Sequence, residues 1–177
     1  MKTIIVTGTP GTGKTTVAKG LAKRLNFAYI DANAIIKKHK ISDGYDKKRK
    51  SRIIGIKKLN KALIKEISML KNDKGNKAGC NGIVIDSHLS HYLPKRYVDM
   101  CIVTRCNLKE LKRRLMKRKY SAGKTRENMD AEIFDVCLVE AKEKGHKIAE
   151  IDTTKGIRQT NKIIKILKNN KIIITTK

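Results

Sequence analysis

The stretch that decides the fold runs from residue 3 to residue 16 and reads Thr3-Ile-Ile-Val-Thr-Gly-Thr-Pro-Gly-Thr-Gly-Lys-Thr-Thr16. Its first residues are mostly β-branched and apolar, which favours a buried strand. Its second half, from Gly8 to Thr15, matches the phosphate-binding pattern G-x-x-x-x-G-K-[ST]. Three apolar residues then recur at helical spacing: Val17, Leu21 and Leu25. A strand, a glycine-rich turn and a helix in this order form the context that the motif requires.

The chemistry expected of this turn follows from its glycines. Without a Cβ, the backbone can bend so that successive N–H groups point inward, and the positive end of the following helix adds to the attraction for phosphate oxygens. Lys14 is placed to reach the β- and γ-phosphates of a nucleotide, and the Thr15 hydroxyl to coordinate Mg²⁺. The alternative is a glycine-rich turn without a ligand, which the flanking strand and helix disfavour.

Length and composition predict one compact domain. The chain has 177 residues, of which 40% are hydrophobic but only 4% aromatic, so the core is expected to be aliphatic. No apolar run is long enough to span a membrane, and the first strand begins almost at the N-terminus, which predicts a cytoplasmic protein. None of the four cysteines forms a C-x-x-C pair, which favours reduced thiols over a zinc site or a disulfide.

The charge of the chain is strongly unbalanced. Lys and Arg number 42 against 16 Asp and Glu, a formal net charge of +26, so at least 26 bases lack an acidic partner. Such a field attracts polyanions, including nucleotides, RNA and anionic surfaces. The alternative is a compositional bias toward lysine with a solvated surface, and the sequence leaves both interpretations open.

Further along the chain, strands and helices are expected to alternate. Strands are predicted at residues 27–30, 82–86, 98–104 and 147–152, helices at 32–38, 53–70, 108–118, 128–144 and 157–167, and an added edge strand at 172–174. The three consecutive apolar residues after Gly82 indicate a strand buried on both faces. With the first strand, this pattern predicts an α/β fold: a five-stranded, doubly wound, mostly parallel sheet with right-handed crossovers and helices on both faces.

Several polar segments follow the predicted strands directly, and ligands of such sheets bind at the carboxyl ends of the strands. These segments are Gly8–Lys14, Asp31, Asp86, Arg105 and residues 153–155. Asp86 is expected to hold the hydration shell of Mg²⁺, with a cap or turn as the alternative role. His88 lies two residues beyond it and becomes a candidate for the chemistry, although a lone histidine is usually structural. Arg105 is a candidate second phosphate contact.

Other side chains are expected to have no part in a site. Arg113 and Arg114 read as surface charges, His39 and His146 as surface residues, and His91 receives no role. In the predicted helix at residues 128–144, four side chains are expected to face the core: Ile133, Val136, Cys137 and Ala141.

A series of motifs in order along the chain resembles the adenylate kinase isoenzyme 6 family, a small branch of the nucleoside monophosphate kinases, in its archaeal form. The motifs are the loop Gly8–Thr16, Asp43-Gly-Tyr-Asp46, Asp86-Ser-His88, Leu93-Pro-Lys-Arg96, Val103-Thr-Arg-Cys106, Arg118-Lys-Tyr-Ser121 and Glu127-Asn-Met-Asp-Ala-Glu-Ile-Phe134. The resemblance covers residues 3–155, nearly the whole chain. The ordered series is specific to the family, whereas the phosphate loop alone is not.

The resemblance implies roles for individual positions. It implies a single P-loop domain over residues 1–177, with a short segment for the monophosphate at about 31–54 and a short lid at about 117–127. The family's nucleotide-binding residues fall on Gly11, Gly13, Lys14, Thr15, Thr16, Arg118 and Lys155. The catalytic positions fall on Lys14, Asp86, His88 and Arg118, and the metal positions on Thr15 and Asp86. The monophosphate segment and the strand ends add Asp31, Arg49 and Arg105 as candidate contacts of the monophosphate.

The resemblance also implies an activity and partners. It implies reversible phosphoryl transfer from ATP·Mg²⁺ to AMP or another monophosphate, with accompanying ATPase activity, in a monomer that works in late maturation of the small ribosomal subunit. The implied partners are a small-subunit ribosomal protein and nearby rRNA, with no membrane. The alternative is primarily an ATP-hydrolysing assembly factor whose kinase activity is secondary. A pure RNA-binding module is disfavoured because it leaves Asp86 and the phosphate loop without a purpose.

Two departures from the family pattern bear on these roles. Residues 47–50 are all basic where the family is usually acidic, which leaves the preferred monophosphate open. Lys119 stands where a glycine commonly follows the lid arginine, and a residue with a side chain is expected to stiffen the hinge of the lid.

Overall fold

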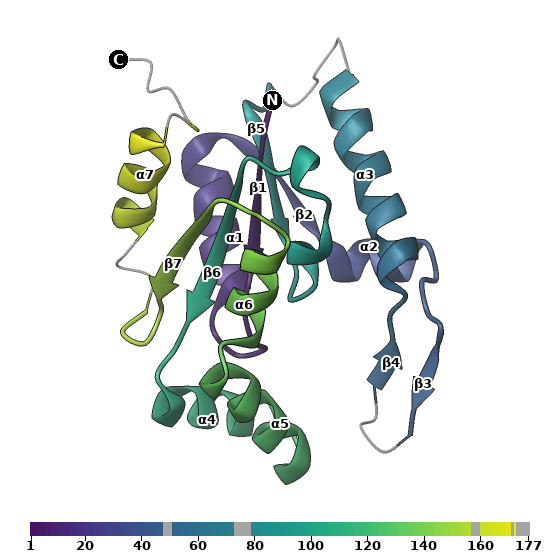
Figure 1. Cartoon of the computed structure of the whole chain (residues 1–177), viewed down its shortest axis with the longest axis vertical. Helices are drawn as coiled ribbons and strands as arrows, with labels where there is room; N and C mark the ends of the chain where they lie inside the picture. The colour runs from purple at the N-terminus through teal and green to yellow at the C-terminus, as the bar shows by residue number, and fades with distance from the viewer. Residues whose placement is uncertain (48–50, 73–78, 157–159, 171, 173–177) are drawn as a thin grey trace.

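The computed structural model describes residues 1–47, 51–72, 79–156, 160–170 and 172. Its centre is a five-stranded sheet in the order β2-β5-β1-β6-β7, in which every neighbouring pair is parallel (Figure 1). The strands are β1 (Lys2–Thr7), β2 (Phe27–Asp31), β5 (Gly82–Asp86), β6 (Met100–Arg105) and β7 (Ile148–Asp152). The prediction of a five-stranded, doubly wound parallel sheet is therefore confirmed.

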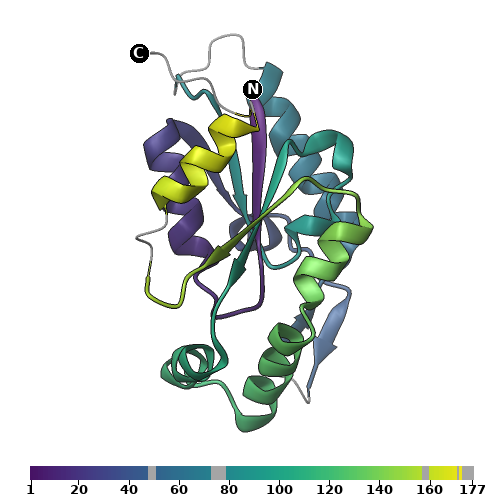
Figure 2. The ribbon, with the colours of Figure 1, turned by 60° about the vertical axis from the view of Figure 1, so that its left-hand side comes forward.

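Helices cover both faces of this sheet, because the strands are apolar on both sides. Ile4, Ile5 and Val6 of β1 are all 0% exposed. Ile4 and Val6 pack in one cluster with α1 (Lys14–Leu25) and α7 (Thr160–Asn169), whereas Ile5 packs with three other helices on the opposite face. Those helices are α2 (Ala32–Lys38), α3 (Ile56–Asn72) and α6 (Val136–Glu143) (Figures 1 and 2).

Three further elements stand at the carboxyl end of the sheet, drawn at the bottom of Figure 1. They are α4 (Leu108–Lys117), α5 (Ala122–Ile133) and the antiparallel hairpin of β3 (Gly44–Asp46) and β4 (Ser51–Ile53). The hairpin lies in a stretch for which the sequence indicated only polar, basic residues and a turn. Its base is tied by Asp43 N–H, which donates to the Ile53 carbonyl at 2.8 Å. Short 3₁₀ turns at Ser90–Tyr92 and Lys95–Tyr97 lead from β5 to β6.

The prediction of a single helix at residues 128–144 is wrong. Two helices, α5 and α6, meet at Asp135. The left-handed backbone of Asp135 (φ 54°) interrupts the helix, so α6 runs in a different direction from α5. The change of direction turns Ile133 and Val136 outward, so they are 52% and 36% exposed instead of facing the core. Of the four expected inward residues, Ala141 is buried and Cys137 half-buried.

The segment predicted as the lid contains the start of a helix. α5 starts at Ala122, where the Ser121 hydroxyl accepts the Lys124 N–H, so residues 122–127 of that segment are helical. Of the expected edge strand at 172–174, only Ile172 lies within the described residues; it is 6% exposed, and its N–H donates to the Leu167 carbonyl at the end of α7. Arg49 lies outside the described residues. Within the described part of the chain, no helix combines the length and the apolar character needed to cross a membrane.

The packing of α3 yields a test of the fold. We predict that Leu63→Ala, at a side chain that is 0% exposed, lowers the free energy of unfolding by about 2–5 kcal/mol because it leaves a cavity against the sheet. Met69→Ala, on the same helix but 56% exposed, should change it by less than about 1 kcal/mol. Urea denaturation of the two variants measures the difference, and equal losses would contradict this description of the core.

Candidate active site

The loop between β1 and α1 has a backbone that only glycine adopts without strain. Gly8, Gly11 and Gly13 have φ of 136°, 101° and 88°. A Cβ at Gly8 would lie 2.5 Å from the Thr104 carbonyl oxygen, and one at Gly11 would lie 2.8 Å from Leu111 Cδ1. Glycine is therefore required here by both conformation and space.

The first turn of α1 is left open at this loop. Gly13 precedes the helix in a left-handed conformation, no side chain caps the helix, and its first turn contains no acidic residue. The first N–H groups of a helix lack partners within the helix, and the helix dipole makes this end attractive to anions. The loop and the helix together form the arrangement that binds phosphate in proteins.

Lys14 lies folded back over the loop, where its Nζ donates to the Thr9 carbonyl at 3.0 Å. Burial lowers the pKa of Lys14 to about 8, against its ordinary value of 10.5, although the nearby thiol of Cys137 and carboxylate of Asp86 act in the opposite direction. The ammonium is thus partly removed from water, and a phosphate would be its natural counter-charge.

Asp86 ends β5 beside this loop and is only 4% exposed. The Tyr29 hydroxyl on β2 donates to Asp86 Oδ2 at 3.0 Å. Burial and the Asp86 charge raise the pKa of Tyr29, so the phenol remains a donor at neutral pH. Asp31 lies directly beside Asp86 in the sheet register, but its carboxylate accepts the Asn33 N–H and caps α2. This contact gives Asp31 a structural role in the free protein.

His88 lies two residues beyond Asp86, and its surface remains open to solvent. Desolvation, followed by the positive charge of Lys14, lowers the pKa of His88 to about 4. The imidazole is therefore neutral at pH 7 and can both donate and accept a hydrogen bond.

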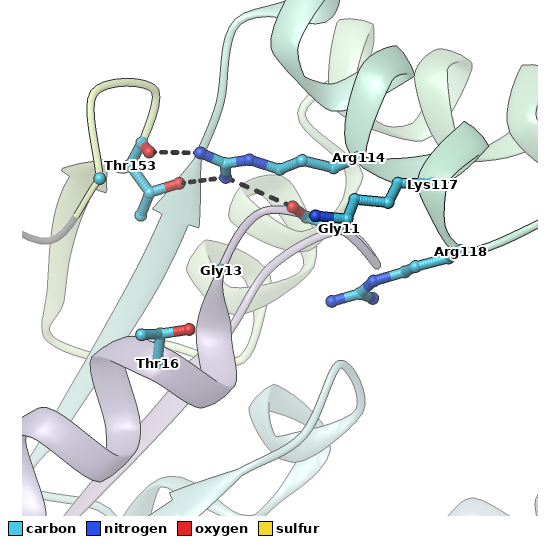
Figure 3. A pocket seen from close by; sticks show the side chains of 8 residues that line it. Gly11, Gly13, Thr16, Arg114, Lys117, Arg118 and Thr153 are labelled. Carbon is cyan, nitrogen blue, oxygen red and sulfur yellow. Dashed lines mark hydrogen bonds between the residues drawn. The ribbon is translucent and has the colours of Figure 1, made fainter.

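A cavity of about 500 Å³ opens beside the loop, between the end of α4 and the turn after β7 (Figure 3). Its lining combines backbone of the loop and the turn with three basic side chains. The lining residues are Gly11, Gly13, Thr16, Arg114, Lys117, Arg118, Thr153 and Gly156. In Figure 3, Arg118 and Lys117 extend from the end of α4 toward the loop. Lys155, predicted to bind the nucleotide, is exposed on the turn next to Gly156.

Arg114 is not the surface charge that the sequence indicated. Its guanidinium donates to the Thr153 carbonyl at 2.7 Å, to the Thr153 hydroxyl at 3.2 Å and to the Gly11 carbonyl at 3.4 Å, while Glu110 holds its Nε at 2.7 Å (Figure 3). Because Arg114 reaches the phosphate loop and the β7 turn from α4, it joins three separate segments at the cavity.

Arg105, predicted as a phosphate contact, forms ion pairs in the free protein. The structure places it among three carboxylates, those of Glu132, Asp135 and Glu150. These charges raise the pKa of Arg105 despite partial burial, and they occupy the guanidinium. Its role in this structure is to tie β6 to the α5–α6 corner and to β7.

Two histidines that were given no role or a surface position are buried. His91 is 1% exposed, with Nδ1 at 2.8 Å from the Thr7 hydroxyl and Nε2 at 2.8 Å from the Glu140 carboxylate. His146 is 9% exposed, and its Nε2 lies 2.8 Å from the His91 carbonyl. A single polar residue among apolar ones forms no periodic pattern, so the sequence carries no signal for this network. The network fixes α6 against the end of β1.

The donors at the loop suit a hard divalent cation. The Thr15 hydroxyl on the first turn of α1 and the Asp86 carboxylate would offer oxygen ligands, and the Asp86 charge acts on neighbouring Lys14. Among the residues that the structure describes, no three His, Cys, Asp or Glu side chains gather into a metal cluster. Mg²⁺ is usually bound by one or two carboxylates together with substrate phosphates and water, and this pair of donors fits that pattern.

The sequence comparisons match a family model and several curated relatives. A family described as AAA domain matches residues 4–135. A protein of Methanocaldococcus jannaschii named "Putative adenylate kinase" is 40% identical over 170 residues, covering 95% of this chain and 87% of the relative. The "Adenylate kinase isoenzyme 6 homolog" of Caenorhabditis elegans is 35% identical over 141 residues, covering 79% of this chain and 72% of the relative.

Solved structures confirm the fold. Shikimate kinase from Acinetobacter baumannii, in complex with shikimate, superposes with a TM-score of 0.66 at 14% identity, covering 98% of this chain and 96% of that one. A sugar kinase from Janibacter sp. HTCC2649 superposes with a TM-score of 0.60 at 17% identity, covering 99% of both chains. At these identities the likeness shows a shared P-loop fold.

The buried Lys14 leads to a pH-dependent prediction. Between pH 8 and 10.5 the unfolded chain holds a proton at Lys14 that the folded protein has lost, so the stability of the wild type rises with pH in this window. Lys14→Met should therefore be more stable than wild type at pH 7, by about 1–3 kcal/mol, and this gap should narrow as the pH approaches 10.5. Urea denaturation at pH 7 and pH 9.5 measures this difference in the free energy of unfolding. Lys23→Met, at an exposed lysine of the same helix, is the control; a gap that does not change with pH would refute the assignment.

Arg114 and Arg113 provide a matched pair. Both donate to Glu110, but Arg114 also binds Gly11 and Thr153. We predict that Arg114→Ala lowers the free energy of unfolding by about 2 kcal/mol more than Arg113→Ala, because buried carbonyls lose a charged donor. Denaturation curves of the two variants test this, and indistinguishable midpoints would show that Arg114 does not hold the loop.

Proposed function

The chain belongs to the adenylate kinase isoenzyme 6 family, and on this premise we propose that it transfers a phosphoryl group from ATP to a nucleoside monophosphate. The observation that carries the proposal is the convergence of separate segments on one sheet edge. This edge carries the glycine loop with Lys14, the uncapped first turn of α1, the carboxylate of Asp86 and the arginine-lined cavity. Phosphoryl transfer depends mainly on positioning and charge stabilisation, which these groups supply.

We assign the ATP side of the site to the loop and the cavity. The N–H groups of the loop and of the first turn of α1 would hold the phosphates, and Lys14 would exchange the Thr9 carbonyl for a phosphate oxygen. The cavity would receive the nucleoside, next to Arg118 and the turn with Lys155. Thr15 and Asp86 would hold Mg²⁺, which neutralises charge on the β- and γ-phosphates when bound.

We assign the acceptor side to the β3–β4 hairpin and the helices that follow β6. The monophosphate segment at residues 31–54 includes this hairpin, and the lid at 117–127 begins where α4 ends (Figure 2). Both lie at the carboxyl end of the one sheet, which supports a single domain over the chain. Arg118 would stabilise charge on the transferring phosphoryl group as the lid closes.

His88 would orient the acceptor phosphate or a water molecule. Its imidazole is neutral at pH 7, so it acts as a hydrogen-bonding group and not as a fixed charge. Because His88 remains open to solvent and the lid is short, water is poorly excluded, and slow ATP hydrolysis should accompany transfer.

A second candidate function is an ATP-hydrolysing factor in small-subunit maturation, bound to a ribosomal protein and near rRNA. The net charge of +26 favours it, since such a field draws the protein toward polyanions. It uses the same phosphate loop and Asp86, and differs in whether water or a monophosphate accepts the phosphoryl group.

The decisive assay measures ADP formation from ATP·Mg²⁺ with and without AMP, CMP, GMP and UMP. We predict strong stimulation by one monophosphate, which would establish the kinase and identify its acceptor. Equal slow hydrolysis in every mixture would instead favour the second candidate, and the assay would be repeated with small ribosomal subunits.

The same assay tests the proposed residues. We predict that Lys14→Ala, Asp86→Asn and Arg118→Ala each lower kcat/KM by about 100-fold or more, because Lys14 and Arg118 would stabilise charge on the phosphates and Asp86 would hold the Mg²⁺. Arg113→Ala, whose side chain is 67% exposed and pairs with Glu110, should stay within about twofold of wild type and serves as the arginine control. Wild-type turnover in Lys14→Ala would refute the site.

A further inference from the structure

A hydrogen bond from Tyr29 on β2 to Asp86 on β5 involves the proposed metal ligand. Tyr29 pairs with Val84 in the register of β2 and β5, and Asp86 lies two residues farther along β5. Two residues of a strand span about 6.6 Å, which is close to the reach of a tyrosine side chain along its strand. The Tyr29 hydroxyl accordingly meets Asp86 Oδ2 at 3.0 Å, at the sheet edge that carries the phosphate loop.

The ring of Tyr29 is itself held in place. It is half-buried and packs against the apolar cluster formed by the sheet, α1 and α7. Lys19 Nζ of α1 lies 5.6 Å from the ring centroid on the same side of the sheet. A fixed ring directs its hydroxyl to one oxygen of Asp86, and this bond restricts the rotation of the carboxylate.

We propose that Tyr29 is a positioning residue that orients the Asp86 carboxylate toward the divalent cation of the nucleotide complex. The proposal rests on the function proposed above, since it gives Asp86 a metal to hold. With Oδ2 bound to the phenol, rotation of the carboxylate is restricted and the second oxygen is left for the cation. Groups that orient a metal ligand in this way contribute about 10- to 100-fold to metal affinity.

The competing interpretation is a purely structural hydrogen bond between β2 and β5. The chain offers a matched control for it, because the Tyr92 hydroxyl donates to the Glu140 carboxylate at 2.6 Å. Glu140 belongs to α6, which covers the opposite face of the sheet from α1. Tyr29→Phe and Tyr92→Phe therefore each delete one phenol–carboxylate bond and leave the ring, but only the first concerns Asp86.

The experiment measures Mn²⁺, as a spectroscopic substitute for Mg²⁺, by electron paramagnetic resonance in the complex of the full chain with a non-hydrolysable ATP analogue. We expect Tyr29→Phe to weaken Mn²⁺ binding about tenfold. Affinity for the analogue in EDTA should stay within about twofold of wild type, which also shows that the variant is folded. Tyr92→Phe should leave both affinities unchanged.

Mn²⁺ affinity of Tyr29→Phe equal to wild type would overturn the positioning role, and so would the same loss of Mn²⁺ affinity in both variants. Failure of the proposed function looks different, because the wild type itself would then bind the analogue without recruiting Mn²⁺. A Tyr29→Phe variant that loses analogue affinity in EDTA as strongly as Mn²⁺ affinity would also overturn the proposal, since the phenol would then support the loop in general.

Discussion

The left-handed backbone of the loop between β1 and α1 is the constraint on which the rest of the structure depends. At Gly8 and Gly11 the loop passes so close to β6 and α4 that a single methyl group would collide with Thr104 or Leu111. The Thr153 hydroxyl donates to the Thr12 carbonyl at 2.6 Å from the far side, and Arg114 binds the Gly11 carbonyl. Segments distant in sequence thus hold an open loop in one shape before any ligand arrives.

The polar groups of this edge are arranged at some cost to stability. Lys14 carries its charge in a site where burial lowers its pKa to about 8, and the N-terminus of α1 has no side-chain cap. Substitutions that would stabilise the folded protein are available at both places. That Lys14 and the uncapped helix start are nevertheless present indicates that they serve a ligand. The basic side chains of Lys117 and Arg118 at the cavity add positive charge to the same edge of the sheet. A triphosphate chain would satisfy all of these groups together.

The sequence allowed the sheet and the loop to be predicted because both leave local patterns. Consecutive apolar β-branched residues mark parallel strands, and glycines at fixed spacing mark the loop. The break at Asp135 and the hairpin after Asp43 were missed because each depends on backbone geometry or pairing that no periodicity records. Arg114 was misjudged for a related reason: its partners come from other parts of the chain. The roles of Lys14, Asp86, His88 and Arg118 in catalysis remain predictions, although the structure places the first three close together.

The most direct test of the central claim is a crystal structure with Mg²⁺ and diadenosine pentaphosphate, an analogue that joins ATP and AMP in one molecule. The account predicts that the phosphate chain follows the loop from Gly8 to Thr15, that one adenosine enters the cavity beside Arg118, and that the other lies next to the β3–β4 hairpin. A phosphate chain bound away from the loop, or only one adenosine ordered with no acceptor position near the hairpin, would contradict transfer between two nucleotides at this edge of the sheet.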